Sequence, residues 1–176
     1  MFKTDIRNHG SGNAGATNVY RIFGKKAGAI VFFLDFSKGI IAVAVTKCIV
    51  ILLDAPYECV LFAGFFAQLG HTFPVFFKFK GGKGVATAAG AALGIMPMTA
   101  MILLALFAVI VLITKFVSLA SGICAALYPL AAYFFSGSRG EYHFIFAASC
   151  AVMIAAKHAP NIRRLLDGEE KKISSE

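Results

Sequence analysis

Apolar residues fall into five long runs that short polar segments separate. The runs cover residues 29–53, 59–77, 85–114, 117–135 and 142–156. At 1.5 Å per residue, helices of these lengths are about what a hydrocarbon layer of roughly 30 Å requires. No run alternates apolar and polar positions for ten residues, as a strand of a membrane barrel would. The pattern therefore predicts an all-α, polytopic bundle of membrane helices.

The third run, residues 85–114, is too long for one upright span, because a single helix would measure about 45 Å. Pro97, with Gly94 just before it, offers a break into two shorter helices. With this break, one side of the membrane receives 14 of the 17 cations, in residues 3–26, 78–83, 115 and 157–172. The positive-inside rule favours that arrangement. We therefore expect six spans with both termini in the cytoplasm.

Composition agrees with a membrane protein. Of the 176 residues, 59% are hydrophobic and 15% are charged, against about 25% charged in soluble domains. Asp35 and Lys38 lie three residues apart inside the first run and are expected to neutralise one another. The four cysteines lie in apolar runs without metal-ligand spacing. We expect one domain over residues 1–176, with no bound metal.

The first polar segment, residues 10–21, reads GSGNAGATNVYR and contains Gly10-x-Gly12-x-x-Gly15. The pattern has no strand before it, so the dinucleotide-binding interpretation fails. Successive glycine amides can instead form an anion-binding nest, and Arg21 would supply a bidentate phosphate ligand. A surface turn followed by a helix cap is an equally good interpretation.

The second polar segment, residues 71–87, reads HTFPVFFKFKGGKGVAT. Its Gly-Gly-Lys-Gly stretch at residues 81–84 resembles a phosphate loop, although glycine and not Ser or Thr follows Lys83. The alternative is a membrane-exit loop whose lysines reach towards lipid headgroups. The glycines favour the close approach of a ligand, beside the start of the next helix.

Two further segments are predicted on the same side. In residues 157–172, His158 and Asn161 are close enough in sequence to face one site, but Pro160 between them makes a regular helix less certain. Ser118 opens the span at residues 117–135, where serine is usually a cap. The highly charged tail from Asp167 to Glu176 is predicted to fray into solvent.

Together these segments resemble the ordered motif set of the PlsY family, the bacterial acyl-phosphate:glycerol-3-phosphate acyltransferases. DFSKG at residues 35–39, SLAS at residues 118–121 and HAPNIRRLLDGEEK from residue 158 complete the set. The resemblance implies a bundle that usually has seven spans, of which this chain lacks the first. It also implies that a fatty acyl group passes from acyl-phosphate to the 1-hydroxyl of glycerol 3-phosphate. The products would be 1-acylglycerol 3-phosphate (lysophosphatidate) and phosphate, in the first step of phospholipid synthesis.

The resemblance implies a setting and a site as well. The enzyme would lie in the bacterial inner membrane among lipids, with its active site facing the cytoplasm, without a cofactor, and with an acyl-phosphate-producing enzyme as partner; nucleic acid would have no role. The catalytic residues, holding glycerol 3-phosphate, would be Ser11, Arg21, Lys83, His158 and Asn161. The acyl-phosphate would be held by Gly12, Asn13, Gly15, Thr17, Asn18, Gly81, Gly82, Gly84 and Ser118.

The residues themselves limit the mechanism. No histidine has an aspartate five positions later, which excludes the His-x4-Asp base of conventional glycerolipid acyltransferases. The acids near the polar segments are Asp5 and the charged tail, so no Ser-His-Asp arrangement is evident. We expect catalysis by positioning and electrostatics, with a substrate phosphate oxygen taking the proton. The main alternative is a transporter or channel for phosphate esters, which a basic vestibule and broken helices also suit.

Overall fold

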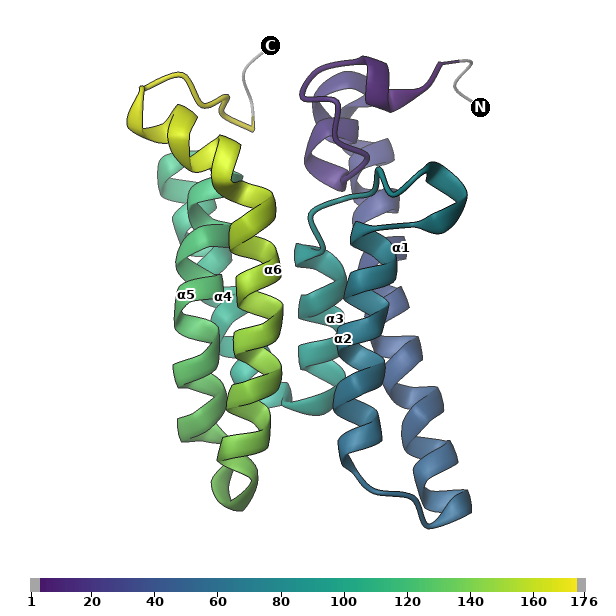
Figure 1. The fold of residues 1–176 in the computed structure, drawn as a ribbon. Coiled ribbons are helices and arrows are strands. Elements are labelled where there is room, and N and C mark those ends of the chain that lie inside the picture. Colours follow the sequence, from purple (N-terminus) through teal and green to yellow (C-terminus); the bar gives the residue numbers. More distant parts are fainter. Residues whose placement is uncertain (1–3, 174–176) are drawn as a thin grey trace.

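The computed structural model describes residues 4–173 and consists of helices joined by short connections (Figure 1). Its elements are η1 (Ile6–Asn8), α1 (Ala16–Leu53), α2 (Glu58–Thr72), η2 (Val75–Phe77), α3 (Val85–Ile95), α4 (Pro97–Thr114), α5 (Val117–Phe135), η3 (Gly137–Arg139) and α6 (Gly140–Leu166). These described residues contain no strand, and the prediction of an all-α bundle is confirmed. Lys3, one of the cations counted above, lies outside the described residues.

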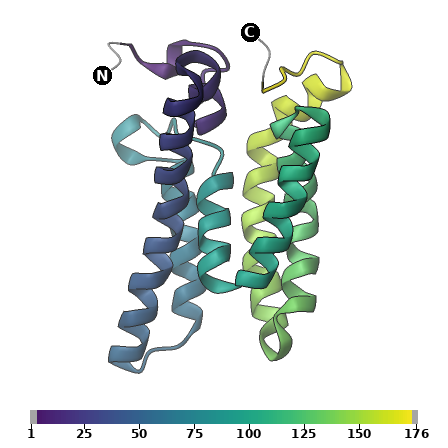
Figure 2. The same ribbon diagram turned by 180° about the vertical axis from the view of Figure 1, so that it is seen from behind.

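The predicted break near Pro97 is confirmed. Met96 is non-helical (φ −133°, ψ 73°), and Pro97 begins α4, where its missing N–H costs nothing. A helix that ends inside an apolar layer leaves carbonyl groups without partners. Lys47 of α1 supplies a partner for one of these carbonyl groups, because its Nζ donates a hydrogen bond to the carbonyl oxygen of Gly94 at 2.6 Å. Because of the break, α1 begins and α6 ends at the same end of the bundle (Figures 1 and 2).

The part of the chain that the structure describes contains six α-helices, but the prediction of six spans is not confirmed. Within residues 4–173, five helical stretches are long and apolar enough to cross a membrane, and α3 is not among them. With 11 residues, α3 measures about 16 Å, or half of a hydrocarbon layer. The break at Pro97 divides the third apolar run into a short and a long helix, so α3 is a half-length helix.

The first and last helices are longer than predicted. The apolar run began at residue 29, whereas α1 begins at Ala16 and bends at Gly24, whose φ of +84° is non-helical. The last run ended at residue 156, whereas α6 continues through Pro160 to Leu166. Hydropathy marks only the part of a helix that lies in hydrocarbon, so it misses turns that extend beyond it. The polar segments therefore lie partly on helices.

The six helices form two groups of three, α1–α3 and α4–α6, which stand side by side (Figures 1 and 2). Within the first group, Gly39 and Gly90 allow α1 and α3 to approach closely. A Cβ atom on Gly39 would lie 2.1 Å from the carbonyl oxygen of Thr87, and one on Gly90 would lie 2.0 Å from that of Phe36. Small residues permit such close crossings in membrane proteins. The crossing holds the start of α3 against α1.

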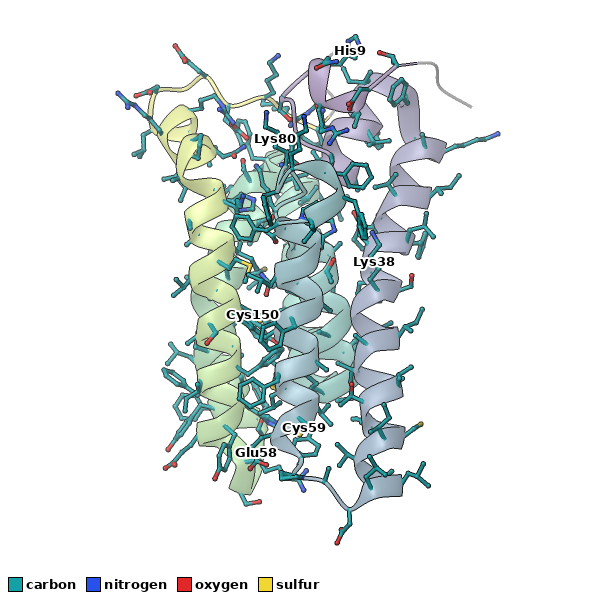
Figure 3. The ribbon with its side chains drawn as sticks, turned by 45° about the vertical axis from the view of Figure 1, so that its right-hand side comes forward. His9, Lys38, Glu58, Cys59, Lys80 and Cys150 are labelled. Atoms are coloured by element: carbon teal, nitrogen blue, oxygen red, sulfur yellow. The ribbon has the colours of Figure 1, made fainter. Side chains whose placement is uncertain are left out.

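The side chains sort as expected for a protein solvated by lipid. Large apolar residues such as Leu52, Phe134 and Val152 are exposed on the outside, whereas alanines such as Ala91 and Ala120 are fully buried. Nitrogen and oxygen atoms gather at the end of the bundle that carries His9 and Lys80, which we call the polar end (Figure 3). It comprises residues 4–21, 78–84, 115–118 and 158–173.

Candidate active site

A pocket opens at the polar end, where α1, α3 and α5 begin and α6 ends. Its lining includes all five residues that the sequence assigned to the catalytic set: Ser11, Arg21, Lys83, His158 and Asn161. It also includes six of the nine residues assigned to substrate binding: Asn13, Gly15, Thr17, Asn18, Gly84 and Ser118. Segments that are distant in sequence thus meet in one place.

Three helix N-termini contribute to the pocket wall. Gly15 to Thr17 belong to the start of α1, Gly84 to Ala86 to the start of α3, and Val117 with Ser118 to the start of α5. The first N–H groups of a helix have no intrahelical acceptor, and the helix dipole makes this end positive. Together with Arg21 and Lys83, the three ends form a site suited to phosphate.

The loop before α1 is folded by two asparagine side chains. Asn18 accepts a hydrogen bond from the backbone N–H of Ser11 at 2.9 Å and donates to the carbonyl oxygens of His9 at 2.9 Å and Asn13 at 3.0 Å. The side-chain oxygen of Asn13 accepts from the N–H of Gly15 at 2.7 Å. Both side chains therefore shape the loop that presents Ser11 to the pocket.

Three of the predicted glycines lie outside the pocket. Gly12 is a turn residue with φ of +70°. Gly81 and Gly82 pack against His71, because added Cβ atoms would lie 2.1 Å from its carbonyl oxygen and 2.1 Å from its Nε2, respectively. Their lack of side chains lets the loop lie on His71, which is a different use from the ligand approach that the sequence suggested. Gly84 is the member of this loop that lines the pocket.

A buried carboxylate supports the same loop from α1. As predicted, Asp35 pairs with Lys38, at 2.8 Å between Oδ1 and Nζ. Asp35 also lies 3.4 Å from Nδ1 of His71, a partner 36 residues away that the sequence pattern did not indicate. Both side chains are about nine-tenths buried and line the pocket below the glycines.

On the opposite wall, a chain of polar contacts leads from Lys83 to the C-terminal segment. Lys83 donates to the side-chain oxygen of Asn161, and the amide nitrogen of Asn161 donates to Glu170 at 2.7 Å. Arg164 donates to the other carboxylate oxygen of Glu170 at 2.8 Å. The Glu170 side chain is only 4% exposed. The prediction that the charged tail frays is wrong for residues 167–173, and residues 174–176 lie outside the described part of the chain. The sequence did indicate a role for this residue, because Glu170 belongs to the motif that begins at His158.

Burial and charge set the ionisation of this chain. The pKa of Lys83 is lowered to about 8, mainly by burial; Glu170 opposes this shift, and the neighbouring Arg164 and Arg21 contribute to it. For Glu170, burial favours the neutral acid, but hydrogen bonds from Asn161 and Arg164 outweigh it and lower its pKa. Near neutral pH, Lys83 is a cation and Glu170 an anion.

Arg21 is held in place by the C-terminal segment. Its Nη2 donates to the carbonyl oxygen of Lys171 at 2.6 Å, and its Nε donates to that of Lys172 at 3.3 Å. A guanidinium group has five N–H donors. These two bonds fix the plane of the group and leave three donors for a ligand in the pocket.

His158 is oriented by the backbone of its own helix. Its Nδ1 lies 2.9 Å from the carbonyl oxygen of Ile154, and the residue is 3% exposed. A carbonyl oxygen can only accept, so Nδ1 carries the proton and Nε2 is left as an acceptor. His158 can therefore accept a hydrogen bond from a hydroxyl group in the pocket.

An apolar groove continues from the pocket between α3, α4 and α5. The pocket and the groove share five lining residues: Phe32, Val85, Ala86, Phe107 and Ser121. Beyond them, half of the lining residues are alanines of α3 and leucines of α4. An anion site that opens into such a groove can hold a molecule with a phosphate and a long hydrocarbon chain.

Comparison with known sequences points to one family. A sequence profile of the family described as "Glycerol-3-phosphate acyltransferase" matches residues 1–168. The glycerol-3-phosphate acyltransferase of Staphylococcus saprophyticus is 43% identical over 177 residues, covering 98% of this chain and 86% of the relative. That of Thermoanaerobacter pseudethanolicus is 43% identical over 171 residues, covering 97% of this chain and 83% of the relative.

Solved structures agree with this result. The chain is similar to the crystal structure of PlsY, an integral membrane glycerol 3-phosphate acyltransferase, in its glycerol 3-phosphate form. The TM-score is 0.84 at 40% identity, over 97% of this chain and 82% of that chain. For the lysophosphatidic acid form the TM-score is 0.81 at 40% identity, over 92% of this chain and 80% of that chain. The resemblance inferred from the motifs is confirmed.

Proposed function

The chain belongs to the family of glycerol-3-phosphate acyltransferases, and from this premise we propose that its acyl donor is an acyl-phosphate. The enzyme transfers the fatty acyl group to the 1-hydroxyl of glycerol 3-phosphate, giving 1-acylglycerol 3-phosphate and inorganic phosphate. The observation that carries this proposal is the junction of a phosphate-binding pocket with an apolar groove. In an acyl-phosphate the phosphate is bonded directly to the acyl group, so the polar pocket and the apolar groove must adjoin.

The two phosphates are assigned to different parts of the pocket. Arg21 and Lys83 bind the phosphate of glycerol 3-phosphate, and Ser11 and Asn161 hydrogen-bond the same substrate. The phosphate of the donor lies against the helix N-termini at Thr17, Gly84 and Ser118, close to the mouth of the groove. The acyl chain then lies between α3, α4 and α5.

The transfer proceeds without a protein base. The 1-hydroxyl oxygen attacks the acyl carbon, the bond between that carbon and the phosphate oxygen breaks, and the departing phosphate takes the hydroxyl proton. His158 hydrogen-bonds glycerol 3-phosphate and so orients it in the pocket. The pocket contains two carboxylates, Asp35 and Glu170, but each is paired with a cation. This pairing argues against either one activating His158, and it supports catalysis by positioning and electrostatics.

The enzyme is proposed to act in the bacterial inner membrane as one domain, with the pocket at the cytoplasmic face. Most of the cations lie at the polar end of the bundle, as the positive-inside rule requires of the cytoplasmic side. There it meets soluble glycerol 3-phosphate and an enzyme that produces acyl-phosphate, and it needs no cofactor. The transporter alternative is less well supported, because the pocket lies at one end of the bundle and transporter sites usually lie at the midplane.

The test compares donors in the purified protein. Palmitoyl phosphate and palmitoyl-CoA are offered separately with glycerol 3-phosphate, and the lipid product is identified by mass spectrometry. We expect 1-acylglycerol 3-phosphate from palmitoyl phosphate only, and its loss in Lys83→Gln. Turnover of the thioester at a comparable or higher rate would overturn the proposed donor while leaving the acceptor unchanged.

A further inference from the structure

The loop that carries Lys83 lies on the last turn of α2. The N–H of Gly82 donates a hydrogen bond to the carbonyl oxygen of His71 at 3.3 Å. A Cβ atom added to Gly81 would overlap that carbonyl oxygen, and one added to Gly82 would overlap Nε2 of the His71 ring. His71 therefore contacts the loop through its backbone and its side chain. Adjacent Cα atoms are fixed about 3.8 Å apart, so a displacement of Gly82 is passed on to Lys83.

The ring of His71 is itself held from α1. Oδ1 of Asp35 lies 3.4 Å from Nδ1 of His71 and 2.8 Å from Nζ of Lys38, and the side chains of Asp35 and His71 are both buried. A carboxylate beside Nδ1 favours the proton there and sets the orientation of the imidazole ring. Nε2, on the far edge of the ring, then faces Gly82. The contact between ring and loop is thus fixed by a charge on another helix.

We propose that the Asp35–His71 pair positions Lys83 for glycerol 3-phosphate by holding Gly82 in place. Both residues act through the loop, so they are positioning residues. The inference rests on the proposed function, because it takes Lys83 as a ligand of the substrate phosphate. Ordering the flexible stem of a lysine costs conformational entropy, and a fixed backbone lowers that cost.

The ionisation of Lys83 reports where its side chain lies. Its pKa is about 8 mainly because the side chain is buried. The charged or titratable groups that face it in the described chain are Arg21 of α1, His158 and Arg164 of α6, and Glu170 of the C-terminal segment. All of them stay unchanged in the variants below. If the loop loses its support, Lys83 moves towards solvent and its pKa rises towards the ordinary value of 10.5. A general loss of stability would not produce this shift.

The test measures the Kd of glycerol 3-phosphate by isothermal titration calorimetry, in purified protein without a donor, between about pH 6 and 10. Gly82→Ala places a methyl group against the fixed ring, so Kd should rise by about tenfold, a typical coupling between residues in contact. The inflection near pH 8 should move to higher pH. Gly70→Ala is the matched control. Gly70 is exposed on α2, and among the described residues no atom lies within 4 Å of an added Cβ. Its Kd and inflection should equal those of wild type.

Two further variants test the route through the histidine ring. His71→Ala removes the ring and should weaken binding, but Gly82→Ala then no longer meets an obstacle. The double variant should therefore bind no more weakly than His71→Ala alone. Asp35→Asn keeps the ring and removes the charge that orients it, so its inflection should also move to higher pH. Should the His71 variants not fold, Gly82→Ala and Asp35→Asn decide the question.

The outcomes separate this inference from the proposed function. If Lys83→Gln binds glycerol 3-phosphate more weakly than wild type, but Gly82→Ala and Asp35→Asn keep the wild-type Kd and inflection, the inference is refuted and the role of Lys83 stands. Additive losses in the double variant would refute it as well. If Lys83→Gln binds as tightly as wild type, the assignment of Lys83 fails and the inference fails with it. The identity of the acyl donor affects none of these measurements.

Discussion

The guanidinium group of Arg21 donates a hydrogen bond to the backbone carbonyl of Lys171, 2.6 Å away, although 150 residues separate them in the sequence. This bond attaches the C-terminal segment to the start of α1. Next to it, Glu170 bonds Asn161 and Arg164 on the end of α6. Residues 170–172 therefore connect the start of α1 with the end of α6, and Glu170 lines the candidate active site between them.

Replacing Arg21 with lysine keeps the charge but removes the planar set of donors. Arg21→Lys cannot hold the two tail carbonyls and a phosphate at once. We expect kcat/KM for glycerol 3-phosphate to fall by about 5- to 150-fold, corresponding to about 1–3 kcal/mol. Arg163→Lys is the matched control, because Arg163 is exposed and lies outside the pocket. Equal, small losses in both variants would show that Arg21 does not bind phosphate.

The lowered pKa of Lys83 predicts a pH dependence. As the pH rises through about 8, Lys83 loses its charge and the phosphate of glycerol 3-phosphate loses a cation. The second ionisation of a phosphate ester is complete by then, since its pKa is about 6. The KM for glycerol 3-phosphate should therefore rise above pH 8. Lys83→Arg should remove this inflection, whereas Lys78→Arg, outside the pocket, should keep it. An unchanged inflection in Lys83→Arg would assign it to another group.

Glu170 is expected to stabilise the site through the C-terminal segment. Glu170→Gln loses the ion pair with Arg164, whose side chain is 39% exposed, so the cost is about 1 kcal/mol. Thermal unfolding in detergent should detect it. The change also removes an anion that favours charged Lys83, so the inflection in KM should move to lower pH. Glu169→Gln, at an exposed neighbouring position, should change neither property. If the two variants behave alike, the buried carboxylate has no such role.

His158 is expected to orient the acceptor hydroxyl without taking its proton. His158→Gln should retain measurable turnover, with the loss mainly in the use of glycerol 3-phosphate. Between about pH 6 and 8 its rate profile should keep the wild-type shape, because phosphate accepts the proton. His9→Gln, at an exposed position outside the pocket, is the control. A variant that is dead at saturating substrate, and whose chemically rescued form lacks an ionisation seen in wild type, would identify His158 as the base.

The sequence predicted the parts of this structure that depend on local chemistry. A proline in a 30-residue apolar run located the break, and the spacing of Asp35 and Lys38 identified an ion pair. Contacts between distant segments were not predictable in this way. Hydropathy says nothing about a polar tail that folds back, so Glu170 was missed. The spacing of glycines also does not show whether the space above them is filled by a ligand or by a side chain of the protein. The packing of Gly82 against the His71 ring was therefore not predicted.

The central claim is that acyl transfer and phosphate release are one event in this pocket. The most direct measurement follows both products together, in purified protein given palmitoyl phosphate with and without glycerol 3-phosphate. We predict one phosphate released for each 1-acylglycerol 3-phosphate formed, and almost no release without the acceptor. Phosphate release that continues at the same rate without glycerol 3-phosphate would contradict the account.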